Sequence, residues 1–316
     1  MLRFTLRQIE YAVAVQNSGS LIEAARTLGI AQPSISAAIV KLEAQLDLQL
    51  FIRRHAQGVT TTAQGASFLA NARNLLAQAR DLQDMADASS SSFEGTLAVG
   101  SFMTLAPAFV PQIIASFRKL YPKVHFRFEE GNQTRLYDGL RSGDFDVALL
   151  YELDVPKDIC VQTLAKLPPY VLLPANHPLA SDKTVALSAL ATTPFVLLDV
   201  VPSKYYFLRL LKEAGVNPSI AFASPSIEMV RGLVGQGLGF SLLTTRPHSN
   251  FTYDGQKLTL CEISEKVELG KFGLATLAQL RKTKLVEAFE RHCLAYFTLL
   301  DYPRQVSLKA PLPNDP

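Results

Sequence analysis

Apolar positions recur at helical spacing in three consecutive segments near the start of the chain. The first segment ends at Asn17-Ser18-Gly19. The second starts at Ser20, which has the capping-box spacing to Glu23, and it ends at Gly29. The third starts with Gln32-Pro33-Ser34, where a proline in the first turn costs no hydrogen bond. Its apolar positions repeat every three or four residues, at Ile35, Ile39, Leu42 and Leu46. Two short helices with a tight glycine-containing turn predict a helix-turn-helix, whose second helix enters the DNA major groove.

Two short apolar segments and a long helical pattern follow. Residues 50–54 and 59–60 predict two strands joined by a polar turn, which together form a wing. Thr61 or Thr62 then caps a predicted helix that extends to about residue 88. Its apolar seam consists of Ala66, Leu69, Ala72, Leu75, Leu76, Ala79, Leu82 and Ala86. Because an apolar seam on a projecting helix needs a partner, we expect two copies of the chain to pair along it.

The pattern changes after the polar run at residues 89–92. From residue 95 to residue 302, strand and helix patterns alternate, which predicts a parallel sheet. We expect five parts: a winged helix-turn-helix (1–61), a linker helix (62–88), a hinge (89–94), a two-lobed α/β domain (95–302) and a flexible tail (303–316). Lobe 1 is predicted at about 95–161 and 268–302, and lobe 2 at about 162–267. The chain is expected to cross between the lobes near 160–166 and 262–268.

Composition narrows the class of protein. A hydrophobic fraction of 48% with 19% charged residues is typical of a globular chain. The net charge of +3 is too small to indicate DNA binding by itself. No apolar run is long enough to span a bilayer and the first residues lack a signal-peptide pattern, so we expect a cytoplasmic protein. The three cysteines suit a reducing compartment as buried apolar residues, and a redox pair of Cys160 with Cys261 is the alternative.

The ordered N-terminal residues resemble the signature of LysR-type transcriptional regulators. The resemblance is carried by Ala24-Ala25, Leu28, Gln32-Pro33-Ser34-Ile35-Ser36, Ile39, Lys41-Leu42-Glu43, Leu50-Phe51, Arg53 and residues 61–65. It implies that Gln32, Pro33, Ser34 and Ser36 open the recognition helix at the major groove, and that Arg53 lies at the minor groove. We add Lys41 and Arg54 as candidates for phosphate contacts. The sequence departs from the family at Ala37, often arginine, and at Asp47, usually glycine.

The region from residue 95 to 300 also resembles the effector domain of these regulators, a two-lobed fold like that of periplasmic binding proteins. Residues 143–148, 173–179 and 235–239 carry this resemblance. It implies that a small molecule binds between the lobes, at the carboxyl ends of strands. The candidate effector residues are Ser101, Phe102, Met103, Thr104, Asn132, Gln133, Tyr151, Asp199, Ser203, Tyr205 and Ser226. Each has the alternative role of a helix cap, turn or core residue. The carboxylate of Asp199 suggests an effector with an amine or amide group.

No catalytic or metal-binding pattern accompanies these features. We therefore expect no enzyme activity, no metal and no cofactor beyond an unidentified effector. The predicted function is ligand-responsive regulation of transcription. The expected partners are promoter or operator DNA, the effector, further copies of the chain in a dimer or tetramer, and RNA polymerase, with no membrane. The alternatives are a solute-binding protein, a two-lobed transferase, and a helical dimerisation module in which Gln32 and Ser34 only cap a helix.

Overall fold

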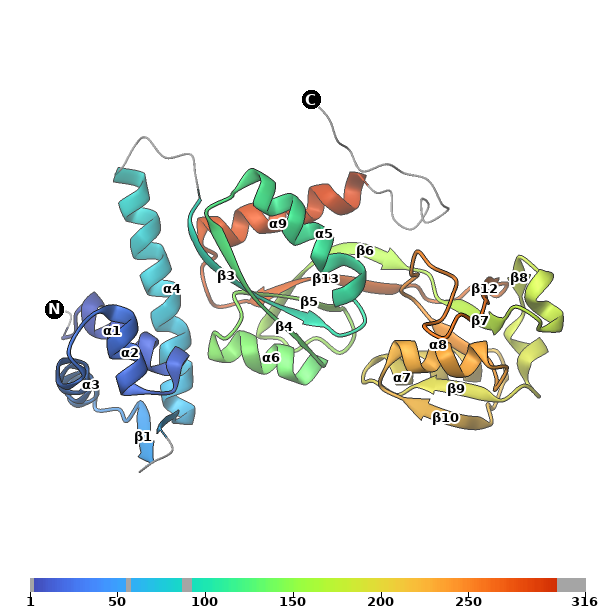
Figure 1. The fold of residues 1–316 in the computed structure, drawn as a ribbon, viewed down its shortest axis with the longest axis horizontal. Coiled ribbons are helices and arrows are strands. Elements are labelled where there is room, and N and C mark those ends of the chain that lie inside the picture. The colour runs from blue at the N-terminus through green and yellow to red at the C-terminus, as the bar shows by residue number, and fades with distance from the viewer. Residues whose placement is uncertain (1–2, 55–57, 87–92, 300–316) are drawn as a thin grey trace.

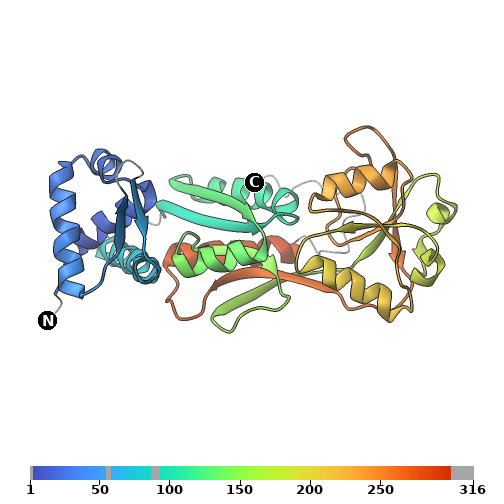
Figure 2. The same ribbon diagram turned by 90° about the horizontal axis from the view of Figure 1, so that it is seen from below.

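The computed structural model describes residues 3–54, 58–86 and 93–299. The predicted hinge residues 89–92, the tip of the wing at 55–57 and the tail at 303–316 lie outside the described residues. An N-terminal domain, a first lobe and a second lobe follow one another in a row (Figure 1). The long helix α4 lies between the N-terminal domain and the first lobe, as the view from below also shows (Figure 2).

The N-terminal domain has the predicted order of elements: α1 (Leu6–Ser18), α2 (Leu21–Leu28), α3 (Gln32–Leu46), β1 (Phe51–Arg54) and β2 (Gly58–Thr61). Ser20 precedes α2, and its side chain accepts a hydrogen bond from the Glu23 amide. The two strands pair antiparallel as a wing. Buried apolar residues from all three helices and from β1 form one core: Ile9, Ala12, Val15, Ala24, Ala25, Ile35, Ile39, Leu42, Leu50 and Phe51.

Left-handed residues end each of these helices. Gly19 and Gly29 end α1 and α2 with φ of 63° and 66°. Asp47, which stands where the family usually has glycine, ends α3 with φ of 52°. Aspartate is one of the few residues with a side chain that enters this conformation routinely. The substitution therefore keeps the turn between α3 and the wing.

The linker helix α4 (Ala63–Ala86) begins after Thr62, whose hydroxyl accepts from the Gly65 amide at 2.8 Å. The predicted seam does not have a single partner. Leu69 and Ala72 are buried in the core of the chain's own N-terminal domain, whereas Leu75 and Leu82 are 40% and 69% exposed. The expectation that the whole seam pairs with a second chain is therefore wrong for its first half. Sequence spacing marks an apolar face without telling which neighbour covers it.

Lobe 1 is a five-stranded sheet in the order β4-β3-β5-β13-β6. Helices α5 and α9 lie on one face of it and α6 lies on the other (Figures 1 and 2). Its elements are β3 (Gly95–Phe102), α5 (Ala106–Leu120), β4 (Val124–Gly131), α6 (Gln133–Ser142), β5 (Val147–Tyr151), β6 (Ile159–Leu167), β13 (Gly270–Leu277) and α9 (Lys284–Leu299). Strands β4, β3 and β5 are parallel as predicted. The prediction is wrong for β13, which runs antiparallel to both of its neighbours because the chain returns from lobe 2 in the opposite direction.

Lobe 2 contains β7 (Tyr170–Pro174), β8 (Thr184–Val185), β9 (Phe195–Leu198), α7 (Ser203–Glu213), β10 (Ile220–Ser224), α8 (Ile227–Gly235), β11 (Ser241–Leu243) and β12 (Leu258–Ile263), with short 3-10 helices at Pro178–Ser181 and Leu187–Leu190. Strand β7 pairs antiparallel with β11 and β12, again unlike the prediction, and β9 pairs parallel with β10. Strand β6 stays paired with β13 as far as Leu167, opposite Gly270. The predicted first crossover, near residues 160–166, falls within this strand, and the sheet of lobe 1 extends past the predicted boundary at residue 161.

The two candidate redox cysteines lie in different sheets. Cys160 is exposed at the start of β6, opposite Thr276. Cys261 is buried in β12, opposite Val171, where burial raises the pKa of its thiol. Both cysteines are free in this structure, so it shows no disulfide between them.

Candidate nucleic-acid interface and effector region

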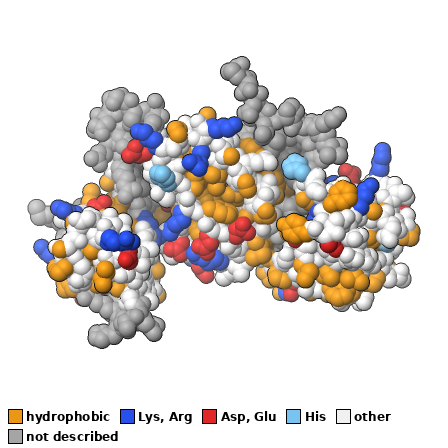
Figure 3. All heavy atoms as spheres, in the orientation of Figure 1, with side chains coloured by type: hydrophobic (Ala, Val, Ile, Leu, Met, Phe, Trp, Pro, Cys, Tyr) orange, Lys and Arg blue, Asp and Glu red, His pale blue; other side chains and the backbone are white. Residues whose placement is uncertain are grey.

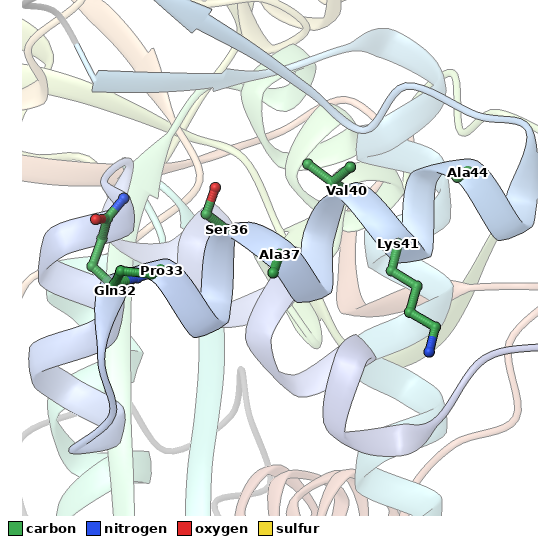
Figure 4. A pocket seen from close by; sticks show the side chains of 7 residues that line it. All are labelled: Gln32, Pro33, Ser36, Ala37, Val40, Lys41 and Ala44. Carbon is green, nitrogen blue, oxygen red and sulfur yellow. The ribbon is translucent and has the colours of Figure 1, made fainter.

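One face of α3 is open to the surface. It is lined by Gln32, Pro33, Ser36, Ala37, Val40, Lys41 and Ala44 (Figure 4). The opposite face carries Ile35, Ile39 and Leu42, which are buried in the domain core. Four of the five predicted recognition-helix residues therefore lie on one open face. The fifth, Ser34, is exposed as well.

The middle and the far end of this face carry three apolar residues that were not predicted as DNA contacts. Ala37 and Ala44 are small and exposed, and Val40 is 53% exposed. Small side chains leave room for a close approach to the helix, and an exposed apolar group suits contact with a thymine methyl group. The helical spacing from Ser36 to Ala44 is a sequence signal that could have identified them.

Hydrogen bonds tie the wing and the residue before it to α3 and to the end of α1. One carboxylate oxygen of Glu43, on α3, accepts hydrogen bonds from the Leu50 and Phe51 amides at 2.7 and 3.0 Å. The Val59 amide donates to the Gly19 carbonyl at 2.8 Å. Arg53 and Arg54 occupy β1 opposite Val59 and Gly58, and their side chains lie outside the described atoms. Glu43 thus sets the position of the wing relative to α3.

A chain of three hydroxyl groups joins the two lobes. Tyr151, at the end of β5, is hydrogen-bonded to Thr104 at 3.2 Å in lobe 1 and to Thr244 at 3.1 Å in lobe 2. All three side chains are buried, and burial raises the pKa of Tyr151. Thr244 and Thr245 follow β11 directly and were not predicted. Their place at the end of a strand is a signal that could have identified them.

The side chain of Gln133, at the start of α6, is hydrogen-bonded to the backbone of Tyr151. The two N–H groups of its side-chain amide are shared among three acceptors, the backbone carbonyls of Tyr151 and Leu153 at 2.8 and 3.1 Å and the Tyr137 hydroxyl at 2.7 Å. Its carbonyl oxygen is buried and has no hydrogen-bond partner among the atoms described. A buried polar group without a partner is costly, which makes this oxygen available to a ligand or a water molecule.

The remaining candidates lie at the end of β3 and at the start of α7. Ser101 is fully buried and Ser203 nearly so. Phe102 is fully buried and packs edge-on against the Tyr151 ring at 5.2 Å. Met103 is half-buried. Phe102 is therefore a core residue of lobe 1, the alternative role that the sequence left open for it.

Four candidates do not join this cluster. Asn132 and Ser226 are exposed N-caps of α6 and α8, and each side chain accepts a hydrogen bond from an amide of its own helix. Tyr205 is 61% exposed. The Asp199 carboxylate forms an ion pair with Lys204 at 2.8 Å. Because its charge is balanced by Lys204, this carboxylate no longer indicates an amine or amide on the effector, whose chemistry stays a prediction.

The described part of the chain was also searched for metal sites and for membrane-spanning helices. No group of three or more His, Cys, Asp or Glu side chains among these residues could hold a metal ion. None of the described helices is long and apolar enough to cross a membrane.

Comparisons with known proteins place both halves of the chain. Residues 6–66 match the family described as bacterial regulatory helix-turn-helix protein, lysR family, and residues 90–298 match the LysR substrate binding domain. The transcriptional dual regulator GltC of Bacillus subtilis is 31% identical over 257 residues, or 81% of this chain and 84% of its own. The structure of HinK, a LysR family transcriptional regulator from Pseudomonas aeruginosa, has 42% identity over 93% of this chain and 99% of its own, with a TM-score of 0.64. A variant of full-length OxyR from Pseudomonas aeruginosa has 25% identity over 92% of this chain and 98% of its own, with a TM-score of 0.76.

Proposed function

This chain belongs to the LysR family of bacterial transcriptional regulators, and from that premise we propose that it reads an operator with the open face of α3. The observation that carries the proposal is the composition of this face, which combines Gln32, Ser36 and Lys41 with small residues between them. Glutamine can form two hydrogen bonds with adenine in the major groove, and lysine suits a phosphate. We assign base contacts to Gln32 and Ser36 and a phosphate contact to Lys41.

We propose that the effector binds where Thr104, Tyr151 and Thr244 join the lobes. The carbonyl oxygen of Gln133, which is buried and has no hydrogen-bond partner among the described atoms, supplies a further polar group to this region. A ligand that replaces the Tyr151–Thr244 hydrogen bond would change the angle between the lobes. It can shift the regulator between states only by as much as its affinity for those states differs.

We also propose that the chain acts by binding and not by catalysis, as its relatives are transcriptional regulators. Pairing of two chains along α4 is supported by the exposed Leu75 and Leu82. Assembly into a dimer or tetramer, contact with RNA polymerase at promoters and a cytoplasmic location are parts of the same proposal. No metal or cofactor is part of it.

The test is to capture fragments of bacterial genomic DNA with the full-length protein and to sequence them. We expect enrichment of a few fragments that share two half-sites about one helical turn apart, or a multiple of that distance. Binding to these fragments should fall steeply with salt, because phosphate contacts release counterions. Equal binding to enriched fragments and to random duplexes of the same length would contradict the proposal.

A further inference from the structure

Helix α6 extends from the effector region to the linker helix. At its first residue, the Gln133 side chain holds the backbone of Tyr151 and Leu153. At its other end, the carbonyls of Ser142 and Gly143 accept hydrogen bonds from the guanidinium of Arg73 on α4. Ten residues of helix span about 15 Å. One rigid element therefore touches both the residue that joins the lobes and the helix that carries the DNA-binding domain.

Arg73 contacts three parts of the molecule at once. Besides the end of α6, its guanidinium donates to the Asn17 side chain on α1 at 3.0 Å. It also lies 3.8 Å from the Asp144 carboxylate of lobe 1. Its side chain is only 15% exposed, and desolvation is the main cause that lowers its pKa. A cation at the C-terminal end of a helix is favoured by the helix dipole, so the guanidinium suits its place at the end of α6.

The backbone at this contact is shaped for close approach. Gly143 has φ of 71°, and a Cβ atom there would lie 2.8 Å from the Cα of Ala70 on α4. Asn74, one residue after Arg73, donates to the Arg281 carbonyl of lobe 1 at 2.8 Å. The contact between α4 and lobe 1 therefore depends on a glycine and on two polar side chains that each reach lobe 1 backbone.

Charged residues on lobe 1 continue the contact toward the start of α6. Asp144 also pairs with Arg135 at 3.2 Å, and Arg135 pairs with Glu129 at 2.7 Å. Figure 3 shows acidic and basic side chains gathered over α6 on the lower side of the central lobe. A cavity of about 60 Å³ remains between α4 and lobe 1, lined in part by Ala70, Arg73 and Asp146. A polar contact with a void can rearrange at lower cost than a close-packed apolar one.

We propose that Arg73 is a latch that holds the linker helix and the DNA-binding domain against lobe 1, and that α6 transmits the state of the effector region to this latch. The proposal deepens the proposed function by naming its regulatory contact, and it rests on that function. A change at Tyr151 moves Gln133 and with it α6, so the carbonyls that Arg73 binds are displaced. The latch then loosens, and the DNA-binding domain gains freedom to turn relative to lobe 1.

The experiment measures amide hydrogen exchange in the full-length protein without DNA and without any added ligand. The four proteins are the wild type, Gln133→Met, Arg73→Met and the double variant. We expect Gln133→Met to speed exchange in the remote segments 14–19 and 63–76 by roughly two- to thirtyfold, the range found for coupled sites. We expect no such added effect in the Arg73→Met background, where the latch is already open.

Two further variants keep the result interpretable. Arg141→Met removes an arginine on the same helix whose ion pairs, with Asp138 and Asp158, are both within lobe 1, and it should leave segments 14–19 and 63–76 at wild-type exchange. Arg73→Lys keeps the charge but cannot reach all three partners. Exchange in segments 14–19 and 63–76 should therefore lie between that of the wild type and that of Arg73→Met, and this variant tests the contact even if Arg73→Met folds poorly.

Two results would contradict the proposal. In the first, Gln133→Met changes exchange only within lobe 1. In the second, Gln133→Met speeds exchange in segments 14–19 and 63–76 equally in the wild-type and the Arg73→Met backgrounds. Because no DNA is present, such a failure is distinct from a failure to bind an operator.

Discussion

Replacing Glu43 by alanine should release the wing from the recognition helix. In the wild type one carboxylate oxygen accepts from two amides, those of Leu50 and Phe51, at 2.7 and 3.0 Å. Hydrogen bonds to a charged group contribute about 1.5–3 kcal/mol each. The two share one oxygen and water can replace part of the loss, so we expect Glu43→Ala to cost about 2–4 kcal/mol locally.

Amide exchange measures this cost at the two affected residues. Since every 1.4 kcal/mol is a factor of ten, exchange at the Leu50 and Phe51 amides should speed by roughly 30- to 1,000-fold. Operator affinity should fall as well, because the wing loses its fixed position beside α3. The matched control is Glu23→Ala, which removes an exposed ion pair with Arg26. Exposed pairs contribute about 0–1 kcal/mol, so this control should change exchange by less than about fivefold.

The result that refutes the reasoning is wild-type protection of both amides in Glu43→Ala. That outcome would mean that the strand pairing of β1 with β2 holds the wing without help from α3. Weaker DNA binding together with unchanged exchange would mean that Glu43 acts on DNA by another route.

Three other changes test separate parts of the proposal. Leu75→Glu with Leu82→Glu should split the dimer by burying like charges along α4, and a dimer that persists in sedimentation would contradict this pairing. Tyr151→Phe removes the hydroxyl contact with Thr244 of lobe 2 as well as the one with Thr104 within lobe 1, so X-ray scattering should detect a changed lobe arrangement, whereas an identical profile would remove the hydroxyl chain from the account. Arg53→Ala should lower affinity for all duplexes and reduce the salt slope by about one, and an altered base preference would instead place Arg53 at a base edge.

The N-terminal elements could be predicted from the sequence because their signals are local. The Ser20 side chain caps α2 by accepting a hydrogen bond from the amide three residues later. Gly19 and Gly29 end helices in a conformation that glycine enters freely. The apolar spacing of Ile35, Ile39 and Leu42 likewise gives the buried face of α3 directly. A pattern within a few residues was enough in each case.

The contacts between the lobes could not be predicted from the sequence because they are long-range. Tyr151 and Thr244 are 93 residues apart in the chain, and no local pattern shows that they meet. The antiparallel direction of β13 depends in the same way on the return of the chain from lobe 2. Asn132 and Ser226 were selected because polar residues after strands line clefts, but the same residue types cap helices, and capping is the role they have here.

The most direct test of the central claim is the base preference of Gln32→Ala. Every single-base variant of one operator half-site is titrated with the wild type, with Gln32→Ala and with Gln162→Ala, a glutamine exposed on β6 of lobe 1. Loss of a bidentate base contact should cost about 1–3 kcal/mol on the best sequence and remove discrimination at one position of the half-site. Gln162→Ala should match the wild type at every position. If Gln32→Ala keeps both the affinity and the base preference of the wild type, α3 does not read the operator through this face and the account is wrong.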